Sequence, residues 1–353
     1  MGDCVREALG GIRGLGREGE VLVVDNGSKD GSVTAAGEAG ARVLLERRIG
    51  YGSALARGIR EAKGDVVVLG DADGSYRFDD LAPLVAAVDR GADLVLGSRL
   101  KGTIEPGAMP WLNRYLGTPV LTLMVRLLFG ARVSDVNCGQ RALSRRAART
   151  LRLRAAGMEF ASEMVIKAAL AGLAIAEVPI RFFKDRRGRP PHLRRWRDGW
   201  RHLRFILLFA PNVVLIAPGL ALFAVGAVLG APAFAGHPHV TAAAGFSASV
   251  LLLVGAQLLQ VGFLAKVWYH VEGFYRRPSL EKVFRYVTLE LGILFGLGLV
   301  AVGVIVGLPL LSSWREGIRP DATRAAVSLT YMVLGMQLVA SSVILSVIGI
   351  RRR

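Results

Sequence analysis

The sequence predicts a doubly wound α/β domain followed by an all-α transmembrane domain of four helices. Short apolar, β-branched runs alternate with helical patterns in the first half, as in βαβ proteins. Four hydrophobic stretches in the second half are each long enough to cross a hydrocarbon core of about 30 Å. Hydrophobic residues reach 52% of the 353, yet 21% are charged, which is typical of a soluble and a membrane part in one chain. The expected limits are 1–190 for the α/β domain, 191–204 for a linking helix and 205–353 for the membrane part.

Buried strands and helices are expected in alternation along the first domain. Short apolar runs bounded by glycine or polar residues predict strands at 20–25, 41–45, 64–70, 93–99 and 175–183. Helical spacing of apolar residues predicts helices at 5–12, from about 32, and at 53–62, 81–90 and 151–173.

Two carboxylates, Asp71 and Asp73, follow the strand 64–70, at the strand end where open α/β sheets place ligands. On an extended chain they would face the same side and could converge on one hard cation. Carboxylate oxygens suit Mg²⁺ or Mn²⁺ bridging a diphosphate. A strand that merely ends in an acidic turn would have the same sequence, so the pair alone does not establish a metal site.

A second polar turn closes the strand 20–25. Asp25 ends that strand, and a Gly/Ser-rich turn leads into the next helix. The Asp25 carboxylate is a hydrogen-bond acceptor for a nucleotide base or ribose. Because such turns are common in α/β proteins, this evidence is weak alone.

Two further segments are candidates for contact with the bilayer surface. The apolar stretch 112–129, which carries Arg114, Pro119 and Arg126, is either a core helix or a helix on the bilayer surface. Residues 181–204 hold ten Lys or Arg against two Asp, with apolar residues at helical spacing: Leu193, Trp196, Trp200 and Leu203. Nucleic acid could bind such a segment, but membrane spans follow directly. A juxtamembrane helix on an anionic leaflet is therefore preferred.

The predicted spans are 205–229, 242–267, 287–311 and 327–350. Lys and Arg concentrate in the link 266–285 and at the end of the chain, whereas the link 231–240 has none. This distribution places both termini, and with them the first domain, on the cytoplasmic side of a multi-pass inner (cytoplasmic) membrane protein. Charge within the spans is almost absent, so the helices are expected to anchor rather than to transport. Cys4 and Cys138 are expected to be reduced thiols.

Five motifs in order resemble family 2 glycosyltransferases, and more closely the polyprenyl-phosphate (dolichol-phosphate) hexose synthases. The likeness covers about 3–204. The motifs are Val23-Val24-Asp25-Asn26-Gly27-Ser28, Gly70-Asp71-Ala72-Asp73, Gly97-Ser98-Arg99, Ser134-Asp135 with Cys138-Gly139 and Arg141, and Glu177-Val178-Pro179-Ile180.

The resemblance implies a GT-A (nucleotide-diphospho-sugar transferase) fold and a Mg²⁺ or Mn²⁺ cofactor. It implies a nucleotide-sugar donor (UDP- or GDP-hexose, with UDP-glucose expected), a polyprenyl phosphate acceptor and inversion at the anomeric centre. Membrane lipid is an expected partner, and nucleic acid is not expected to bind. The chain could also form a homo-oligomer.

The resemblance also implies roles for individual residues. It assigns the metal to Asp71 and Asp73, the nucleotide-sugar to Asp25, Gly27, Ser28, Asp71 and Arg99, the acceptor phosphate to Arg114, Arg141 and Arg186, and catalysis to Asp73, Arg99 and Asp135. Arg99 and Arg114 would both hold phosphates. Because an acceptor phosphate is already an oxyanion, Asp135 is expected to position groups on the acceptor side of the site rather than to act as a base.

The sequence departs from the family in three places. Ser75 stands where members often carry a Gln that helps hold the metal, so the third ligand is open. His192 to Trp196 resembles the Gln-x-x-Arg-Trp motif of processive polysaccharide synthases but lacks the Gln. A processive synthase is therefore one alternative function, and a catalytically silent membrane scaffold is the other. The family's first strand is expected to be absent, in which case the domain would be N-terminally truncated. The strands ending in Asp25 and Asp71 are therefore expected to be separated by a slot and not bonded to each other.

Overall fold

The computed structural model describes residues 1–186, 195–237, 240–271, 289–318 and 321–350. It contains two compact units, Met1–Phe209 and Ala210–Arg353. Residues 205–209, expected to open the first span, belong to the first unit, where Ile206 is fully buried and Phe209 is 8% exposed. The parts of the predicted basic segment at 187–194, including Leu193, lie outside the described residues.

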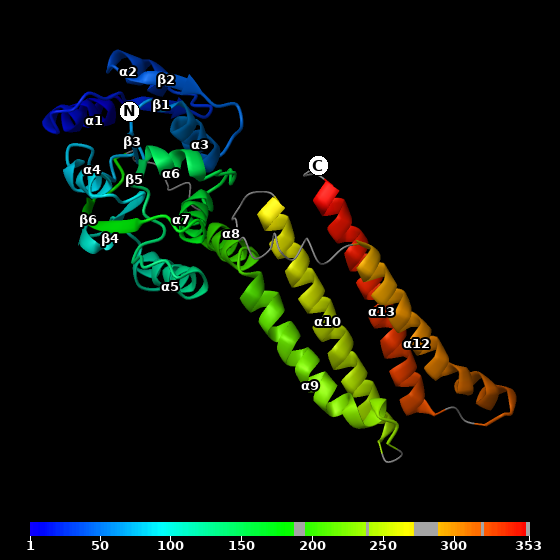
Figure 1. Ribbon diagram of the computed structural model, residues 1–353. Helices are drawn as coiled ribbons and strands as arrows, with labels where there is room; N and C mark the ends of the chain where they lie inside the picture. Colours follow the sequence, from blue (N-terminus) through cyan, green and yellow to red (C-terminus); the bar gives the residue numbers. More distant parts are fainter. Residues whose placement is uncertain (187–194, 238–239, 272–288, 319–320, 351–353) are drawn as a thin grey trace. The chain divides into compact units, whose positions relative to one another are not determined.

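The first unit contains two sheets (Figure 1). The smaller sheet pairs β1 (Leu22–Asp25) with β2 (Arg42–Leu45) in parallel. The larger has the order β3-β5-β4-β6, with bounds Val66–Leu69, Arg141–Ser144, Leu94–Ile104 and Ile175–Phe182. β4 and β6 are parallel, whereas β5 is antiparallel to both of its neighbours.

Three features differ from the sequence prediction. The larger sheet is mixed rather than parallel, because β5, a four-residue strand that was not predicted from the sequence, lies between β3 and β4. β4 does not end at Arg99 but continues to Ile104, since β6 pairs with it again past a bulge. The helix expected at 151–173 is confined to α7 (Phe160–Leu170), because Glu163 accepts the backbone N–H groups of the non-helical segment before it.

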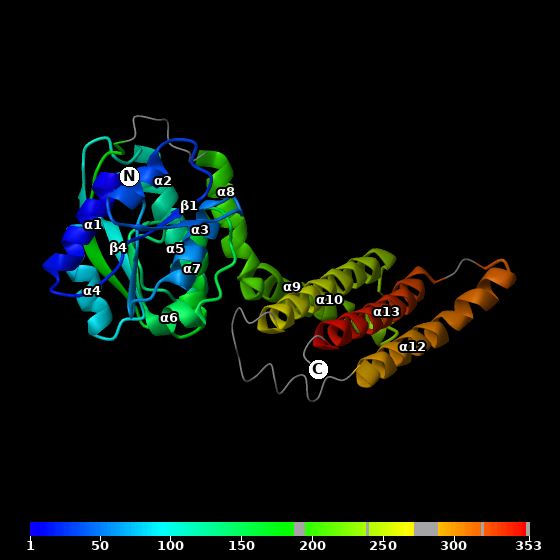
Figure 2. The same cartoon turned by 90° about the horizontal axis from the view of Figure 1, so that it is seen from above.

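The helices of the first unit flank these sheets (Figure 2). They are α1 (Gly2–Gly14), α2 (Ser32–Glu38), α3 (Tyr51–Glu61), α4 (Ala82–Asp89), η1 (Asn113–Gly117), α5 (Thr118–Phe129), α6 (Arg145–Thr150), α7 and α8 (Arg195–Leu208). α4 packs on one face of the larger sheet through Leu84 and Ala87, which meet Val95 and Val178. Because alternate strand residues face opposite sides, Leu94 belongs to the other face, and it is fully buried too.

β1 and β3 belong to different sheets, and in the described part of the chain no backbone ladder joins them. The expectation that these two strands are not bonded to each other is confirmed. α1 contacts residues next to both sheets. Gly2 lies against the carbonyl of Ala35 in α2, while the Glu7 carboxylate accepts the backbone N–H of Phe78 at 2.7 Å.

The second unit consists of η2 (Asn212–Ile216), α9 (Ala217–Phe234), α10 (Ala242–Val271), α12 (Leu289–Arg315) and α13 (Ala322–Ile350). Within it, α9 packs on α10 and α12 packs on α13 (Figure 1). Glycines allow the close approach, since a Cβ on Gly226 would lie 2.8 Å from the backbone nitrogen of Leu252, and one on Gly296 would lie 2.7 Å from the carbonyl oxygen of Gly335.

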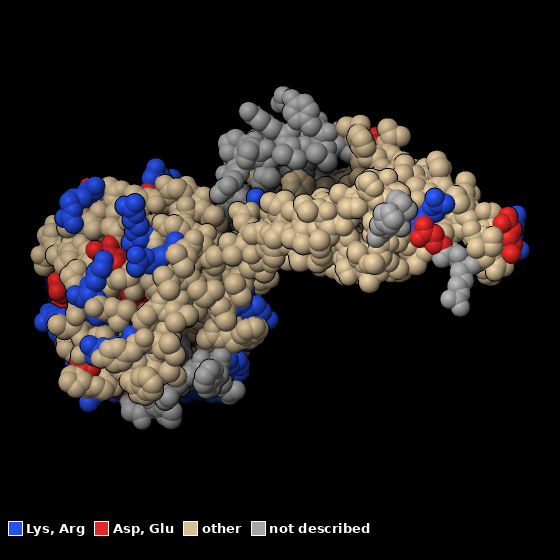
Figure 3. All heavy atoms as spheres, turned by 90° about the horizontal axis from the view of Figure 1, so that it is seen from below, with Lys and Arg blue, Asp and Glu red and all other residues tan. Residues whose placement is uncertain are grey.

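Four helical segments are long and apolar enough to cross a membrane: Asn212–Phe234, Ala242–Val271, Leu289–Arg315 and Ala322–Ile348. In Figure 3 the surface of this unit is almost free of Lys, Arg, Asp and Glu along the helices, with charges gathered at one end. The predicted four spans are confirmed, and the chain is a multi-pass membrane protein.

Candidate functional site

The Asp71–Asp73 loop follows β3 directly. β3 ends at Leu69, and residues 72–75 form a turn rather than the extended chain assumed from the sequence. Asp73 Oδ1 accepts the backbone N–H of Ser75 at 2.9 Å, and Gly74 adopts a φ of +80°, which favours glycine. The turn therefore holds the Asp73 carboxylate at the carboxyl end of the strand.

Arg186 lies over this turn. Its backbone N–H donates to the Asp73 carbonyl at 3.0 Å, and its Cγ and Cδ would each lie 3.0 Å from a Cβ on Gly74. The structure thus brings together two residues assigned separately from the sequence, one to the acceptor phosphate and one to the metal.

Asp71 lies beside Gly139 and two tyrosines, Tyr51 and Tyr76. A Cβ at Gly139 would lie 2.6 Å from Asp71 Oδ2, and the Gly139 N–H donates to the Tyr76 hydroxyl at 2.9 Å. Burial, then the Asp71 charge, raises the pKa of Tyr51 well above its usual value, and the Tyr51 hydroxyl hydrogen-bonds Asp71. Tyr51 is thus a neutral hydrogen-bond donor to Asp71. The absence of a side chain at Gly139 lets the Asp71 carboxylate lie directly against the backbone there.

Arg99 and Asp135 form a buried ion pair. Nε and Nη2 of Arg99 donate to Oδ2 and Oδ1 of Asp135 at 2.7 and 2.8 Å, and the guanidinium lies 5.2 Å from the centre of the Phe182 ring. Asp135 is completely buried, so it does not line an open acceptor site as expected from the sequence. Its carboxylate instead orients Arg99.

Glu177 on β6 was given no role from the sequence. Its Oε1 accepts the backbone N–H groups of Ser134 at 2.5 Å and Asp135 at 3.1 Å, and its Oε2 accepts from Lys101 Nζ at 2.7 Å. The Glu177 side chain is only 2% exposed. Glu177 therefore holds the backbone of the loop that presents Asp135 to Arg99. A carboxylate within the apolar run at the start of β6 was the signal that could have identified it.

Arg141 is buried and engaged by the backbone, contrary to the role expected for it. It donates to the carbonyls of Val136 at 2.7 Å, Cys138 at 2.8 Å and Ala161 at 2.7 Å, and it is 2% exposed. It therefore shapes the loop that carries Gly139, and we assign it no acceptor phosphate. Burial raises the pKa of the neighbouring Cys138 thiol to about 12, so this thiol is neutral at physiological pH.

Arg114 shows no direct contact with the Asp71–Asp73 loop among the described residues. It lies on η1, 5.4 Å from the centre of the Tyr115 ring. This contact, rather than one with the Asp71–Asp73 loop, is what the described residues show for it.

The Asp25 turn is connected to the Asp71 loop through Asn26. Asp25 accepts the backbone N–H groups of Gly27 and Ser28, each at 3.1 Å, and its hydrogen bonds with Ser28 lower its pKa most. Asn26 Nδ2 donates to the carbonyl of Glu46 at 2.8 Å, while its Oδ1 accepts the N–H of Gly50 at 2.6 Å. Gly50 precedes Tyr51, so Asn26, also missed as a site residue, links the two turns.

A divalent cation fits the donor set of this loop. Mg²⁺ is usually held by one or two carboxylates plus substrate phosphates, so two aspartates are enough. The lack of a side chain at Gly139, where a Cβ would lie 2.6 Å from Asp71 Oδ2, allows the carboxylate to take this position. No group of three or more His, Cys, Asp or Glu suited to a metal occurs among the described residues.

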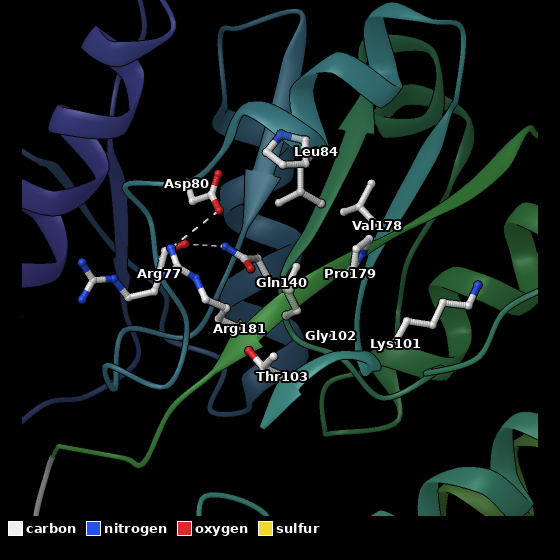
Figure 4. Close-up of a pocket in the computed structure, with 12 residues that line it drawn as sticks. Arg77, Asp80, Leu84, Lys101, Gly102, Thr103, Gln140, Val178, Pro179 and Arg181 are labelled. Atoms are coloured by element: carbon white, nitrogen blue, oxygen red, sulfur yellow. Dashed lines mark hydrogen bonds and ion pairs between the residues drawn. The ribbon is translucent and has the colours of Figure 1, made fainter. Parts of the chain in front are cut away.

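A separate cavity of about 330 Å³ lies against β4, β6 and α4 (Figure 4). Its cationic side chains are paired with acids, Arg181 with Asp80 at 3.8 Å and Lys101 with Glu177 at 2.7 Å. Neither Asp71 nor Asp73 lines it, so it is distinct from the candidate site.

The chain thus combines an α/β domain that carries paired aspartates after a strand with four helices able to cross a membrane. The model of the family described as Glycosyl transferase family 2 matches residues 3–152, and that of the Glycosyltransferase family 2 C-terminal transmembrane region matches 263–349. The chain is 34% identical to the low-salt glycan biosynthesis hexosyltransferase Agl6 of Haloferax volcanii, over 99% of this chain and 86% of the relative. The chain belongs to glycosyltransferase family 2, and its first unit is of the GT-A class.

Two other similarities are narrower. The chain is 33% identical to the dolichyl-phosphate hexose transferase of the same organism, over 48% of this chain and 72% of the relative. A crystal structure of glucosyl-3-phosphoglycerate synthase from Mycobacterium tuberculosis with phosphoglyceric acid superposes with a TM-score of 0.46 and 24% identity. That superposition covers 59% of this chain and 75% of the synthase.

Proposed function

We propose that this membrane glycosyltransferase transfers a hexose, glucose from UDP-glucose, to polyprenyl phosphate, with inversion at the anomeric carbon. The observation that carries the proposal is the Asp71–Asp73 loop with Gly139 beside Asp71 and Arg186 over Gly74. The similarity to a protein named dolichyl-phosphate hexose transferase supports the choice of acceptor.

In this proposal Asp71 and Asp73 hold Mg²⁺ or Mn²⁺, and Asp25, Gly27 and Ser28 contact the nucleoside. The cation, when bound, neutralises charge on the leaving diphosphate. Arg99 uses two of its nitrogen atoms to bind Asp135, and its Nη1 is proposed to meet the donor phosphates. A guanidinium already fixed by a buried carboxylate needs no reorganisation as charge develops.

The transfer forms one bond and breaks one. An oxygen of the acceptor phosphate attacks the anomeric carbon, and the bond from that carbon to the diphosphate oxygen breaks. Because the acceptor is already an anion, no side chain has to remove a proton. Arg186, which lies over the turn at Gly74, is proposed to orient the acceptor phosphate, and Arg114 stays a second candidate.

The acceptor is expected to arrive from the bilayer along α5. Leu116, Val120, Leu123 and Leu127 recur at helical spacing and are 54%, 44%, 52% and 75% exposed. Trp111 and Tyr115 extend the same segment, at 71% and 67% exposed, and Trp200 on α8 is 59% exposed. We call the four residues at helical spacing, Leu116, Val120, Leu123 and Leu127, the apolar face. An apolar surface of this kind supports the bilayer interpretation of the segment 112–129 over a wholly buried core helix.

The proposed test supplies membranes containing the protein with radiolabelled UDP-glucose, GDP-mannose or UDP-galactose and with polyprenyl phosphate. The expected product is a lipid carrying one labelled sugar, formed with UDP-glucose. A labelled polymer would favour the processive-synthase alternative, and no donor-dependent label from any nucleotide sugar would favour the silent scaffold.

A further inference from the structure

A second cavity of the first unit, about 510 Å³, is lined by four arginines. Arg60 comes from the end of α3, Arg145 and Arg149 lie one turn apart on α6, and Arg152 follows that helix. Buried apolar residues form its floor, with Ile59 and Leu151 each 6% exposed. We call this cavity the arginine groove.

The arginine groove lies at the other end of β3 from the candidate site. In the β3–β5 ladder Leu69 pairs with Arg141, next to the Asp71 loop, whereas Val66 pairs with Ser144. Arg145 then donates its backbone N–H to the carbonyl of Asp65 at 2.8 Å. Three residue steps of strand, about 10 Å, separate the two ends, so the arginine groove is not part of the donor site.

The charge of the arginine groove is not compensated by acids. No Asp or Glu is among its lining residues, and in the described parts of the chain Arg60, Arg149 and Arg152 make no ion pair. Arg146, on the same short helix, is by contrast paired with Asp93. The cationic residues of the cavity in Figure 4 are also paired with acids.

Like charges gathered around a concave surface concentrate anions from solution. Arg145 is also fixed in advance, because its guanidinium donates to the carbonyls of Ala62, at 2.8 Å, and Lys63. A guanidinium group can donate two parallel hydrogen bonds to the oxygens of one phosphate, so four guanidinium groups can bind more than one phosphate. We propose that the arginine groove binds an anion with two or more phosphate groups, either a soluble polyphosphate or the headgroup of a lipid that carries two phosphates, such as cardiolipin.

Two arms of one experiment distinguish these sources. The full chain in phosphatidylcholine nanodiscs is titrated calorimetrically with inorganic pyrophosphate and tripolyphosphate, with EDTA present to suppress metal-dependent diphosphate binding at Asp71 and Asp73. In parallel, chain reconstituted with cardiolipin is released into detergent, and the retained cardiolipin is counted by native mass spectrometry.

The Arg149→Gln/Arg152→Gln variant removes two exposed arginines of the groove, and Arg13→Gln/Arg90→Gln makes the same charge change at exposed positions elsewhere. We expect the groove variant to bind one of the two ligands at least tenfold more weakly, and the control to bind as the unaltered chain does. Saturable binding of polyphosphate supports the soluble ligand, and selective loss of cardiolipin supports the lipid. If the double variant does not fold, the two single variants replace it. Binding of neither ligand, or equal losses in both variants, would overturn the proposal.

Discussion

Gly139 lies against Asp71 so closely that a Cβ would come within 2.6 Å of the carboxylate oxygen Oδ2. The two residues are far apart in the sequence, and β5, between β3 and β4, brings them together. In the proposed mechanism this contact fixes the position in which the Asp71 carboxylate meets the metal and the donor.

Gly139→Ala should displace Asp71 and lower transfer activity by about 10²-fold or more, the scale for losing one preorganised electrostatic contact. The free energy of unfolding should fall by only about 1–3 kcal/mol, as for other overpacked sites. Gly37→Ala is the matched control, because nothing lies within 4 Å of its Cβ position on α2. Unchanged kinetics of Gly139→Ala would show that the contact has no role in the reaction.

Glu177→Gln should lower kcat by about 10- to 100-fold, since it removes charge-assisted hydrogen bonds worth about 1.5–3 kcal/mol. The loss should come through misplacement of Asp135 and Arg99, with metal affinity unchanged. Lys101→Gln removes the more exposed partner of Glu177 and should change kcat less than threefold. Equal losses of kcat in the two variants would argue against a positioning role of Glu177.

Leu123→Asp/Leu127→Asp should raise the KM for long-chain polyprenyl phosphate by about tenfold or more, because two leucines of the apolar face no longer enter the bilayer. The KM for the nucleotide sugar should not change. Ala82→Asp/Ala171→Asp, which adds two carboxylates at exposed positions on another part of the unit, is the control. A similar rise in both KM values would instead indicate a general packing defect.

The Lys and Arg distribution predicts that both termini are cytoplasmic. A reporter fused after Arg353 should be active only in the cytoplasm, and one fused at Gly236, after the first span, only on the opposite side. A reporter after Arg353 that signals from outside would invert the topology and place the first unit away from cytoplasmic nucleotide sugars.

The sequence predicted the order of most elements, because apolar periodicity reports burial directly. It could not predict β5, whose four residues begin with a buried arginine, Arg141, which the family resemblance had assigned to the acceptor phosphate. Nor could it show that the Asp135 carboxylate is enclosed by Arg99 or that Glu177 supports it. Such contacts join residues from different strands, and local patterns carry no information about their distance.

The membrane segments were predicted more closely than the site, because a span is defined by length and hydrophobicity alone. The first span was nonetheless started too early, at 205 instead of Asn212. The apolar end of α8 continues into the span pattern, yet Ile206 is buried within the first unit.

The most direct test of the account measures radiolabelled glucose transfer to polyprenyl phosphate by the unaltered chain, Asp73→Asn and Asp89→Asn. Asp89 forms an exposed ion pair with Arg17, which follows α1, and serves as the control for loss of one carboxylate. Transfer should stop with EDTA, return with Mg²⁺ or Mn²⁺, fall by at least 10²-fold in Asp73→Asn, and stay unchanged in Asp89→Asn. Transfer that persists in EDTA, or in folded and membrane-bound Asp73→Asn, would contradict the metal-dependent mechanism.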